Sequence, residues 1–358
     1  MRIVIDATST LVRSAGVKNY IWHWLRHLRQ QGADIRAFPF LDDLGLLDHE
    51  ASALSRPETM ARLALIKSMN ETGFPPLDWL IRGADVFHAT NLLRRRPQRA
   101  KLTATIHDLT CWLMPELHTP ANVKADREFA ETILQRADGL IAVSENTRQD
   151  AMGVLGIAPD RIRTIHSGIA EEYFHATPIP RARPYALYVG TIEPRKNLDA
   201  LLDAWGLLKP SLRAEFDLLI AGPRGWSSAE TLARIEREAT YLGYVPEGDL
   251  PGLTAGATVF VYPSLYEGFG FPVAQAMAAG APVVTSSNSS LPEIAADAAI
   301  LIDPKSPSEI AAALTRLFES ESLRADLALR GRNRAQAFRW EECATESLHF
   351  FRSVCGSV

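Results

Sequence analysis

The chain has 358 residues, 47% of them hydrophobic and 22% charged, and this length and composition are typical of a soluble globular protein with two domains. Its formal net charge of −4 argues against general nucleic-acid binding, which requires a broad cationic surface. Its three scattered cysteines exclude a disulfide framework and a cysteine-rich zinc site. With no signal peptide and no long apolar span in the sequence, we expect a cytoplasmic protein.

Short apolar runs alternate with amphipathic segments along most of the chain, and this alternation predicts βα repeats and parallel sheets. In the first half, helices are expected at Val17–Gln31 and Asn122–Ala137 and also within residues 41–80. The expected strands of this half are Arg2–Ala7, Asp34–Phe40, Asp85–Ala89, Leu102–His107, Gly139–Val143 and Arg161–His166.

The same pattern restarts in the second half of the chain. Its expected strands are Tyr185–Gly190, Asp217–Gly222, Val259–Pro263, Pro282–Ser286 and Ala299–Ile302. The proline-containing stretch 171–184 is expected to be an exposed linker between a domain of residues 1–170 and a domain of residues 185–339. Residues 340–355 are expected to form a helix that is not part of the second sheet.

The strongest functional signal is the segment VFVYPSLYEGFGFPVAQAMAAGAPVV, in which a strand ends at Pro263 and a helix begins near Pro272. The loop between them holds Glu267, Gly268, Phe269 and Gly270. Its glycines allow the backbone to approach a ligand, and the helix N-terminus offers free N–H groups to an anion. Gln275 is expected about two turns inward, on the same side of the helix as Glu267. An incidental glutamate in a structural crossover explains these residues equally well.

Two further groups of residues follow strands of the second half. Arg195 and Lys196 lie in the loop IEPRKN and suit a diphosphate leaving group, although arginine and lysine are more often simply solvated. Gly222 follows one strand in IAGPRGW, and Tyr244 and Val245 lie in LGYVPEG. We also expect Ser144 and Asp249 to be helix N-caps.

In the first half, His107 follows a strand in ATIHDLT, and ligands collect at the carboxyl ends of such strands. Gly16 lies in the loop STLVRSAGVKNY after the first strand. The basic run LLRRRPQRAK includes Arg94, Arg95 and Arg96. It is either a solvated loop or a contact for an anionic acceptor or for lipid headgroups at the inner face of the membrane.

These segments resemble family 4 of the retaining glycosyltransferases, which has the GT-B fold. The resemblance is strong over residues 185–304 and weaker over residues 1–170. It implies an α/β protein of two Rossmann-like domains facing across a cleft, with the final helix packed on the first domain. It further implies that Glu267 faces the hydroxyls of the donor sugar, that Lys196 holds the diphosphate, and that Gln275 stands where a second glutamate usually binds the ribose.

The resemblance also assigns the remaining candidates. It implies that His107 contacts the donor sugar and that Gly16 belongs to a loop over the donor phosphates. It places Gly222, Tyr244 and Val245 in the base-binding region. The sequence departs from the family at Gln275, at Thr191, where arginine is common, and at Ala15 and Lys18, where glycine is common. Arg195 is the candidate for the cation that Thr191 does not supply, and Lys18 for added charge near the cleft.

The implied activity is a retaining, metal-independent hexosyl transfer from a nucleotide diphosphate sugar, taken here as GDP-mannose. The acceptor is expected to be a saccharide or a lipid-linked molecule in polysaccharide assembly, with no further cofactor, no nucleic-acid partner and peripheral membrane contact left open. No Asp-x-Asp stands at a strand end, so we expect no catalytic metal. Two alternatives remain: a sugar-nucleotide 2-epimerase and a non-catalytic sugar-nucleotide-binding protein.

Overall fold

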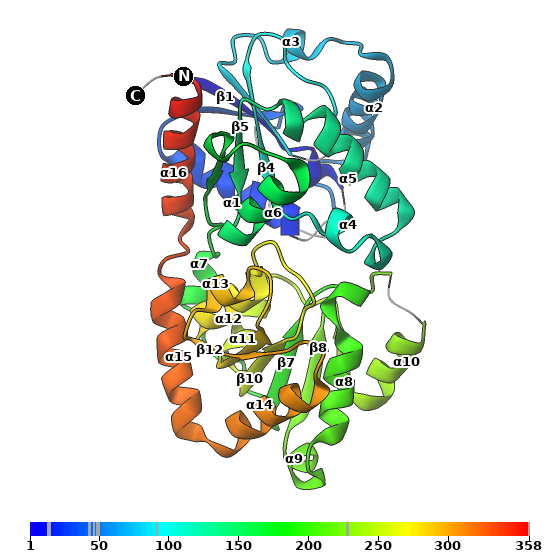
Figure 1. The fold of residues 1–358 in the computed structure, drawn as a ribbon, viewed down its shortest axis with the longest axis vertical. Coiled ribbons are helices and arrows are strands. Elements are labelled where there is room, and N and C mark those ends of the chain that lie inside the picture. Colours follow the sequence, from blue (N-terminus) through cyan, green and yellow to red (C-terminus); the bar gives the residue numbers. More distant parts are fainter. Residues whose placement is uncertain are drawn as a thin grey trace. The chain divides into compact units, whose positions relative to one another are not determined.

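The computed structural model describes residues 1–12, 16–41, 44–45, 47, 51–90, 92–226 and 229–356. The chain forms two compact units, Met1–Gly168 with Trp340–Val358, and Ile169–Arg339 (Figure 1). The division follows Gly168, so residues 171–184 are grouped with the second unit. Residues 177–184 are exposed. They begin with the short helix α7 (Glu171–Phe174), whose Tyr173 is buried.

The first unit is built on a six-stranded parallel sheet of order β2-β1-β3-β4-β5-β6. Most strand residues are buried because helices cover the sheet, as the near-continuous apolar runs predict. The six strands lie within two residues of the expected bounds: β1 Arg2–Asp6, β2 Asp34–Phe38, β3 Val86–Ala89, β4 Lys101–Ile106, β5 Gly139–Ala142 and β6 Ile162–Thr164.

The helices of this unit connect successive strands. Helix α2 begins with a capping box of Ser55 and Glu58, and Ser144 directly precedes α6, where its Oγ accepts the N–H of Thr147 at 3.0 Å. Ser144 is therefore an N-cap, as expected. The bounds are α1 Gly16–Gln30, α2 Arg56–Thr72, α3 Leu77–Leu80, α4 Thr110–Leu113, α5 Pro120–Thr132 and α6 Glu145–Leu155. Short 3-10 helices span Thr8–Leu11, Pro115–Leu117, Leu134–Arg136 and Pro159–Arg161.

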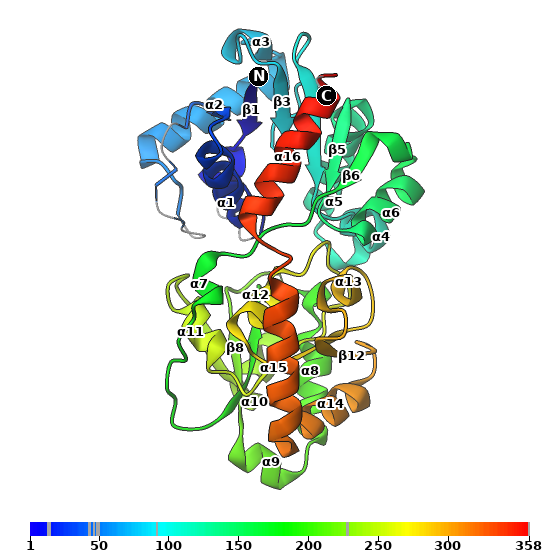
Figure 2. The ribbon, with the colours of Figure 1, turned by 90° about the vertical axis from the view of Figure 1, so that its left-hand side faces the viewer.

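The last helix, α16 (Trp340–Val354), packs beside α1 in the first unit (Figure 2). The indole N–H of Trp24 donates to the Ser347 hydroxyl at 2.9 Å, and the His23 ring stacks on Trp340 with 5.6 Å between centroids. A Cβ on Gly168 would collide with Trp340, so this glycine permits the close approach of the chain to α16.

The second unit has a six-stranded parallel sheet of order β12-β11-β10-β7-β8-β9, the Rossmann order. Five strands match expectation: β7 Tyr185–Val189, β8 Asp217–Ala221, β10 Val259–Tyr262, β11 Val283–Ser286 and β12 Ala299–Ile302. The edge strand β9 (Thr240–Gly243) was not expected; it has only four residues, and none of them is fully buried.

The helices of the second unit flank this sheet. The N-cap expected at Asp249 is wrong, because its side chain makes no capping hydrogen bond to α11. The bounds are α8 Leu198–Leu207, α9 Pro210–Glu215, α10 Ala229–Glu238, α11 Leu250–Ala255, α12 Phe271–Ala279, α13 Leu291–Ala295, α14 Pro307–Glu319 and α15 Glu321–Ala335, with a 3-10 helix at Pro194–Lys196.

Strand order reverses between β7 and β10 in the second sheet and between β1 and β3 in the first. Ligands of doubly wound sheets bind at such switch points, beyond the carboxyl ends of the strands. A ligand site is therefore expected at the loops that follow β7 and β10. In the part of the chain that the structure describes, no helix is long and apolar enough to cross a membrane.

Candidate active site

The loops that follow β7 and β10 are tied together at the carboxyl edge of the second sheet. Asn197 adopts a left-handed conformation with φ of 61°, which turns the chain from the Pro194–Lys196 turn into α8. Its side-chain amide donates to the Pro263 carbonyl at 2.9 Å. The Leu265 N–H donates to the Arg195 carbonyl at 2.8 Å. The two loops thus hold each other in place without a ligand.

Glu267 is the centre of a buried ion-pair cluster formed by these loops. Its Oε1 lies 2.6 Å from Lys196 Nζ and accepts the hydroxyls of Ser264 at 2.7 Å and Tyr262 at 3.0 Å. Its Oε2 lies 3.1 Å from Arg195 Nη1. The other side of the Arg195 guanidinium contacts Glu193 at 2.7 Å. Two cations and two carboxylates therefore alternate in one network.

The electrostatics of the cluster keep Glu267 ionised. Burial by itself raises the pKa of Glu267, but the charges of Arg195 and Lys196 outweigh burial and lower this pKa to about 2. The side chains of Arg195 and Lys196 are each only 11% exposed. The interpretation of these two residues as solvated surface cations is therefore wrong.

The segment after β11 holds the loop that carries Glu267 through hydrogen bonds. The Glu267 N–H donates to Ser289 Oγ at 3.0 Å, and Ser290 Oγ donates to the carbonyls of Glu267 and Phe269, both at 2.9 Å. Gly270 then takes a φ of 97°, and a Cβ there would also meet Leu291 at 2.7 Å. Only glycine suits this turn into α12, the helix that follows Gly268 and Phe269 in the chain.

Gln275 lies about one turn into α12 and is half-buried. Because α12 begins at Phe271, Glu267 precedes the helix and is not part of it. The expected spacing of two helical turns between Glu267 and Gln275 is therefore wrong. Their relation depends on the left-handed turn at Gly270 and not on helical periodicity.

A third group lies at the carboxyl ends of β8 and β9. Gly222 has a φ of 139°, and a Cβ there would collide with the Gly190 carbonyl, so the loops after β7 and β8 approach at this glycine. The Gly222 N–H donates to the Gly243 carbonyl at 2.7 Å. Tyr244, 38% exposed, and the half-buried Val245 follow directly. Gly222, Tyr244 and Val245 thus share one edge of the sheet, and their contact with a base stays a prediction.

His107 and Gly16 belong to the first unit, at the carboxyl edge of its sheet. His107 follows β4 directly, and its ring packs edge-to-face on Tyr20 with 4.9 Å between centroids. Burial lowers the pKa of His107 to about 4, so the imidazole is neutral at physiological pH. Its Nε2 is buried and has no hydrogen-bond partner among the residues that the structure describes. A ligand hydroxyl would satisfy this nitrogen.

Gly16 and Lys18 both belong to α1. Gly16 is the first residue of α1 and is exposed, whereas Ala15 lies outside the described residues. Lys18 does not add exposed charge near a site, because it is 2% exposed and its ammonium donates to the Ala51 carbonyl at 2.7 Å. The reason is that Lys18 lies among the buried residues of the amphipathic helix α1.

Sequence reasoning missed the residues that hold the cluster in place, chiefly Glu193, Tyr262, Ser264 and Ser289. Glu193 lies two positions before Arg195 and Ser264 three positions before Glu267, in the same loops, so position beyond a strand end was an available signal. Tyr262 is a strand residue and Ser289 belongs to another loop, and nothing local marks either. Over the described ranges, no group of three or more histidine, cysteine, aspartate or glutamate side chains is arranged to hold a metal ion.

Two family profiles together match most of the chain. The profile described as Glycosyltransferase Family 4 matches residues 14–173, and the one described as Glycosyl transferases group 1 matches residues 170–334. O-antigen chain mannosyltransferase B of Escherichia coli is 35% identical over 283 residues, which are 75% of this chain and 74% of that protein. Serotype-specific mannosyltransferase WbdA of E. coli is 27% identical over 281 residues, 72% of this chain but only 34% of that longer protein.

Solved structures agree on the fold. Sucrose-phosphate synthase from Thermosynechococcus elongatus superposes with a TM-score of 0.73 at 20% identity, over 100% of both chains. At this identity the likeness establishes the fold alone. The expected fold class, an α/β protein of two Rossmann-like units of the GT-B type, is confirmed.

Proposed function

The chain belongs to glycosyltransferase family 4, and from that premise we propose that it is a retaining, metal-independent hexosyltransferase that moves mannose from GDP-mannose to a saccharide or lipid-linked acceptor in polysaccharide assembly. The observation that carries this proposal is the cluster of Lys196, Arg195 and Glu267 at the switch point between β7 and β10. A diphosphate leaving group needs fixed positive charge, and this cluster supplies two cations at the place where such sheets bind ligands.

Lys196 is the residue that we assign to the leaving group. Its ammonium has three N–H donors, and Glu267 accepts one of them at 2.6 Å. The remaining donors suit oxygens of the β-phosphate, where negative charge grows as the glycosidic bond breaks. Because Glu267 holds the ammonium before the donor arrives, no reorganisation of the cation is needed during the reaction.

Retention is proposed to follow from attack on the same face that the leaving group departs from. A covalent route would need a reactive carboxylate, but Glu267 is stabilised by four protein groups and its pKa is lowered to about 2, after burial and the opposing Arg195 and Lys196 charges are combined. Such a carboxylate is a poor nucleophile. We therefore assign Glu267 to binding the sugar and orienting the cations, and His107 to a hydrogen bond with the donor sugar.

Metal independence is supported by the same two cations, because they supply the charge that a divalent ion provides in other phosphate sites. The choice of mannose is supported by the two relatives that are named mannosyltransferases. GDP is proposed as the nucleotide, with its base beside Tyr244 and Val245, and no further cofactor takes part.

The test is a panel of GDP-, UDP-, ADP- and dTDP-sugars, first by thermal shift and then by transfer to mannose oligosaccharides in excess EDTA. A ligand that binds only the folded state raises the melting temperature, and it does so more the more tightly it binds. GDP-mannose, the proposed donor, is therefore expected to raise it most. Transfer with an α-linked product, identified by NMR, is the expected outcome. Conversion of the donor without an acceptor would identify an epimerase instead. Donor binding without transfer to any acceptor would identify a non-catalytic binding protein.

A further inference from the structure

We propose that the first unit docks on a membrane surface rich in anionic phospholipids through one face, made of Phe74, Trp79, Arg96 and Arg136. We call it the arginine–aromatic face. The inference goes beyond the sugar transfer proposed above and does not depend on it, because within the first unit the face and His107 lie at opposite edges of the sheet. It selects the lipid contact among the interpretations of the basic run, the others being a solvated loop and a contact for an anionic acceptor.

The aromatic part of the face lies beside α3. Phe74 is 62% exposed and Trp79 is 67% exposed, and their rings meet edge-to-face with 6.1 Å between centroids. The turn that presents Phe74 is fixed, because Ser68 Oγ donates to its carbonyl at 2.8 Å. Two large aromatic rings in contact and facing solvent are suited to the interfacial layer of a bilayer.

The cationic part is a cavity of about 830 Å³, whose lining includes Gly73 and Asp78, the chain neighbours of Phe74 and Trp79. Further lining residues come from α5, from the 3-10 helix Leu134–Arg136 and from the loop between β3 and β4. Its charged lining residues are Asp78, Glu131, Arg94, Arg95, Arg96 and Arg136. Asp78 is engaged by the backbone N–H groups of Gln98 and Arg99 at 3.0 to 3.1 Å. The cavity therefore has an excess of positive charge.

The arginines of this cavity differ in how far they are already engaged. Arg94 forms an ion pair with Glu128, and the Arg95 guanidinium donates to the carbonyls of Met69 and Asn70 at 2.6 and 2.7 Å. Arg96 and Arg136 are exposed and have no ion pair within the described part of the chain. These last two are available to phosphate oxygens of lipid headgroups.

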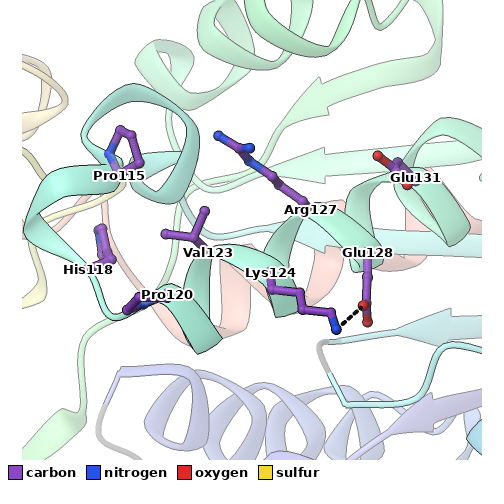
Figure 3. A pocket seen from close by; sticks show the side chains of 8 residues that line it. All are labelled: Pro115, His118, Pro120, Val123, Lys124, Arg127, Glu128 and Glu131. Carbon is purple, nitrogen blue, oxygen red and sulfur yellow. Dashed lines mark ion pairs between the residues drawn. The ribbon is translucent and has the colours of Figure 1, made fainter.

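The neighbouring cavity of about 390 Å³ on α5 does not share this charge excess (Figure 3). Lys124 and Arg127 line it together with Glu128 and Glu131, and Lys124 lies 3.8 Å from Glu128. Its charges balance, so it is not part of the docking face. Of these two cavities, only the larger one, lined by residues of α3, has an excess of positive charge.

The face lies at the amino edge of the first sheet. Arg136 precedes β5, and the loop that carries Arg96 leads into the start of β4, whereas His107 follows the end of β4. Figure 1 shows α3 at the end of the first unit where β1 begins. Docking through this face therefore leaves the carboxyl edge of the sheet uncovered. Because the whole chain carries a net charge of −4, attraction to anionic lipid has to come from such a local surface.

The experiment is co-sedimentation of the full chain with phosphatidylcholine vesicles that contain either no anionic lipid or about one third phosphatidylglycerol. Binding to the anionic vesicles only is expected, and it should weaken with salt. The double variant Arg96→Glu/Arg136→Glu should weaken it by roughly 25-fold or more, because each arginine near such a surface contributes about fivefold. Phe74→Ser/Trp79→Ser should weaken it by about tenfold.

Matched controls come from exposed residues of the second unit. Arg213→Glu/Arg316→Glu changes the net charge equally, and Leu207→Ser/Leu329→Ser removes equally exposed apolar side chains. Both controls should bind as the unchanged chain does, with folding checked by circular dichroism. Equal loss in the charge control and the face variant would overturn the proposal, as would no binding to anionic vesicles. Self-association lost in Trp79→Ser without vesicle binding would instead identify an interface between copies of the chain.

Discussion

Lys196 and Glu267 are 71 positions apart in the sequence, yet Nζ of one lies 2.6 Å from Oε1 of the other, with both side chains close to 90% buried. The pairing of β7 with β10 in the sheet brings their two loops together. The contact links folding to chemistry, because the lysine proposed to hold the leaving group also neutralises a buried carboxylate. Changes at either residue are therefore expected to alter activity and stability together.

Lys196→Ala is expected to lower kcat/KM for donor transfer by about 10²–10³, because a fixed cation at the leaving group is lost. It is also expected to reduce the free energy of unfolding by about 3–5 kcal/mol, since Glu267 keeps a buried charge without its partner. An exposed loop lysine would leave stability unchanged, and that is the expected result for the control Lys209→Ala. Steady-state kinetics and denaturant unfolding check both effects. A fall in kcat/KM below threefold would place the diphosphate elsewhere.

Glu193→Gln tests whether Glu193 positions Arg195. The Arg195 guanidinium lies between Glu193 at 2.7 Å and Glu267 at 3.1 Å, so loss of one anchor should let it move. We expect kcat to fall by about tenfold with the melting temperature lowered only slightly, and Glu193→Asp to recover part of the loss. Full activity in Glu193→Gln, measured at saturating donor, would show that Arg195 is oriented without Glu193, by Glu267 and the Tyr266 carbonyl.

The second unit is expected to lose stability in acid between about pH 4.5 and pH 2. Burial raises the pKa of Glu267, but Arg195 and Lys196 more than offset this and hold it at about 2, below its ordinary value of 4.5. Above pH 4.5 the carboxylate contributes its full stabilisation, about 3 kcal/mol, and this is lost as pH falls through the folded pKa. Glu267→Gln should flatten that part of the curve, whereas the exposed Glu319→Gln should not.

The first unit is expected to lose stability in acid at a higher pH than the second unit does, because it contains two buried histidines. Burial lowers the pKa of His88 to about 3 and that of His107 to about 4. Below pH 6.5 the unfolded chain takes up protons that the folded unit does not, so stability falls as pH falls, by roughly 1 kcal/mol per histidine and pH unit. Hydrogen exchange of first-unit peptides between pH 7 and 5 checks this, and His88→Asn should reduce the slope. The exposed His349→Asn is the control.

Gln275→Glu is expected to leave the fold intact and to tighten donor binding by about 1 kcal/mol. A carboxylate accepts stronger hydrogen bonds from ribose hydroxyls than an amide does, and α12 begins only one turn earlier, so its N-terminus favours the added charge. Calorimetry with the best nucleotide measures the change, with the exposed Gln135→Glu as the control. Weaker binding in Gln275→Glu would mean that the amide makes another contact.

Local patterns in the sequence were sufficient for most of the fold. Runs such as Val259–Tyr262 are apolar on both faces and read as buried parallel strands without any knowledge of their neighbours. The last helix was also expected from the sequence, and the structure gives it the bounds Trp340–Val354. The strand β9 was not predicted from the sequence. It lies at the edge of the sheet, pairs with a strand on one side only, and has no fully buried residue.

The sequence by itself also determined which loops are candidates, because residues beyond strand ends gather at one edge of a parallel sheet. It did not determine which of those loops touch, because the order of strands in a sheet is not a local property. Only the tertiary structure placed Lys196 and Arg195 against Glu267, and only it showed that Glu193 clamps Arg195 and that Lys18 is turned inward. The physical reason is that the state of a charged side chain depends on which groups replace its water, and those groups come from distant parts of the chain.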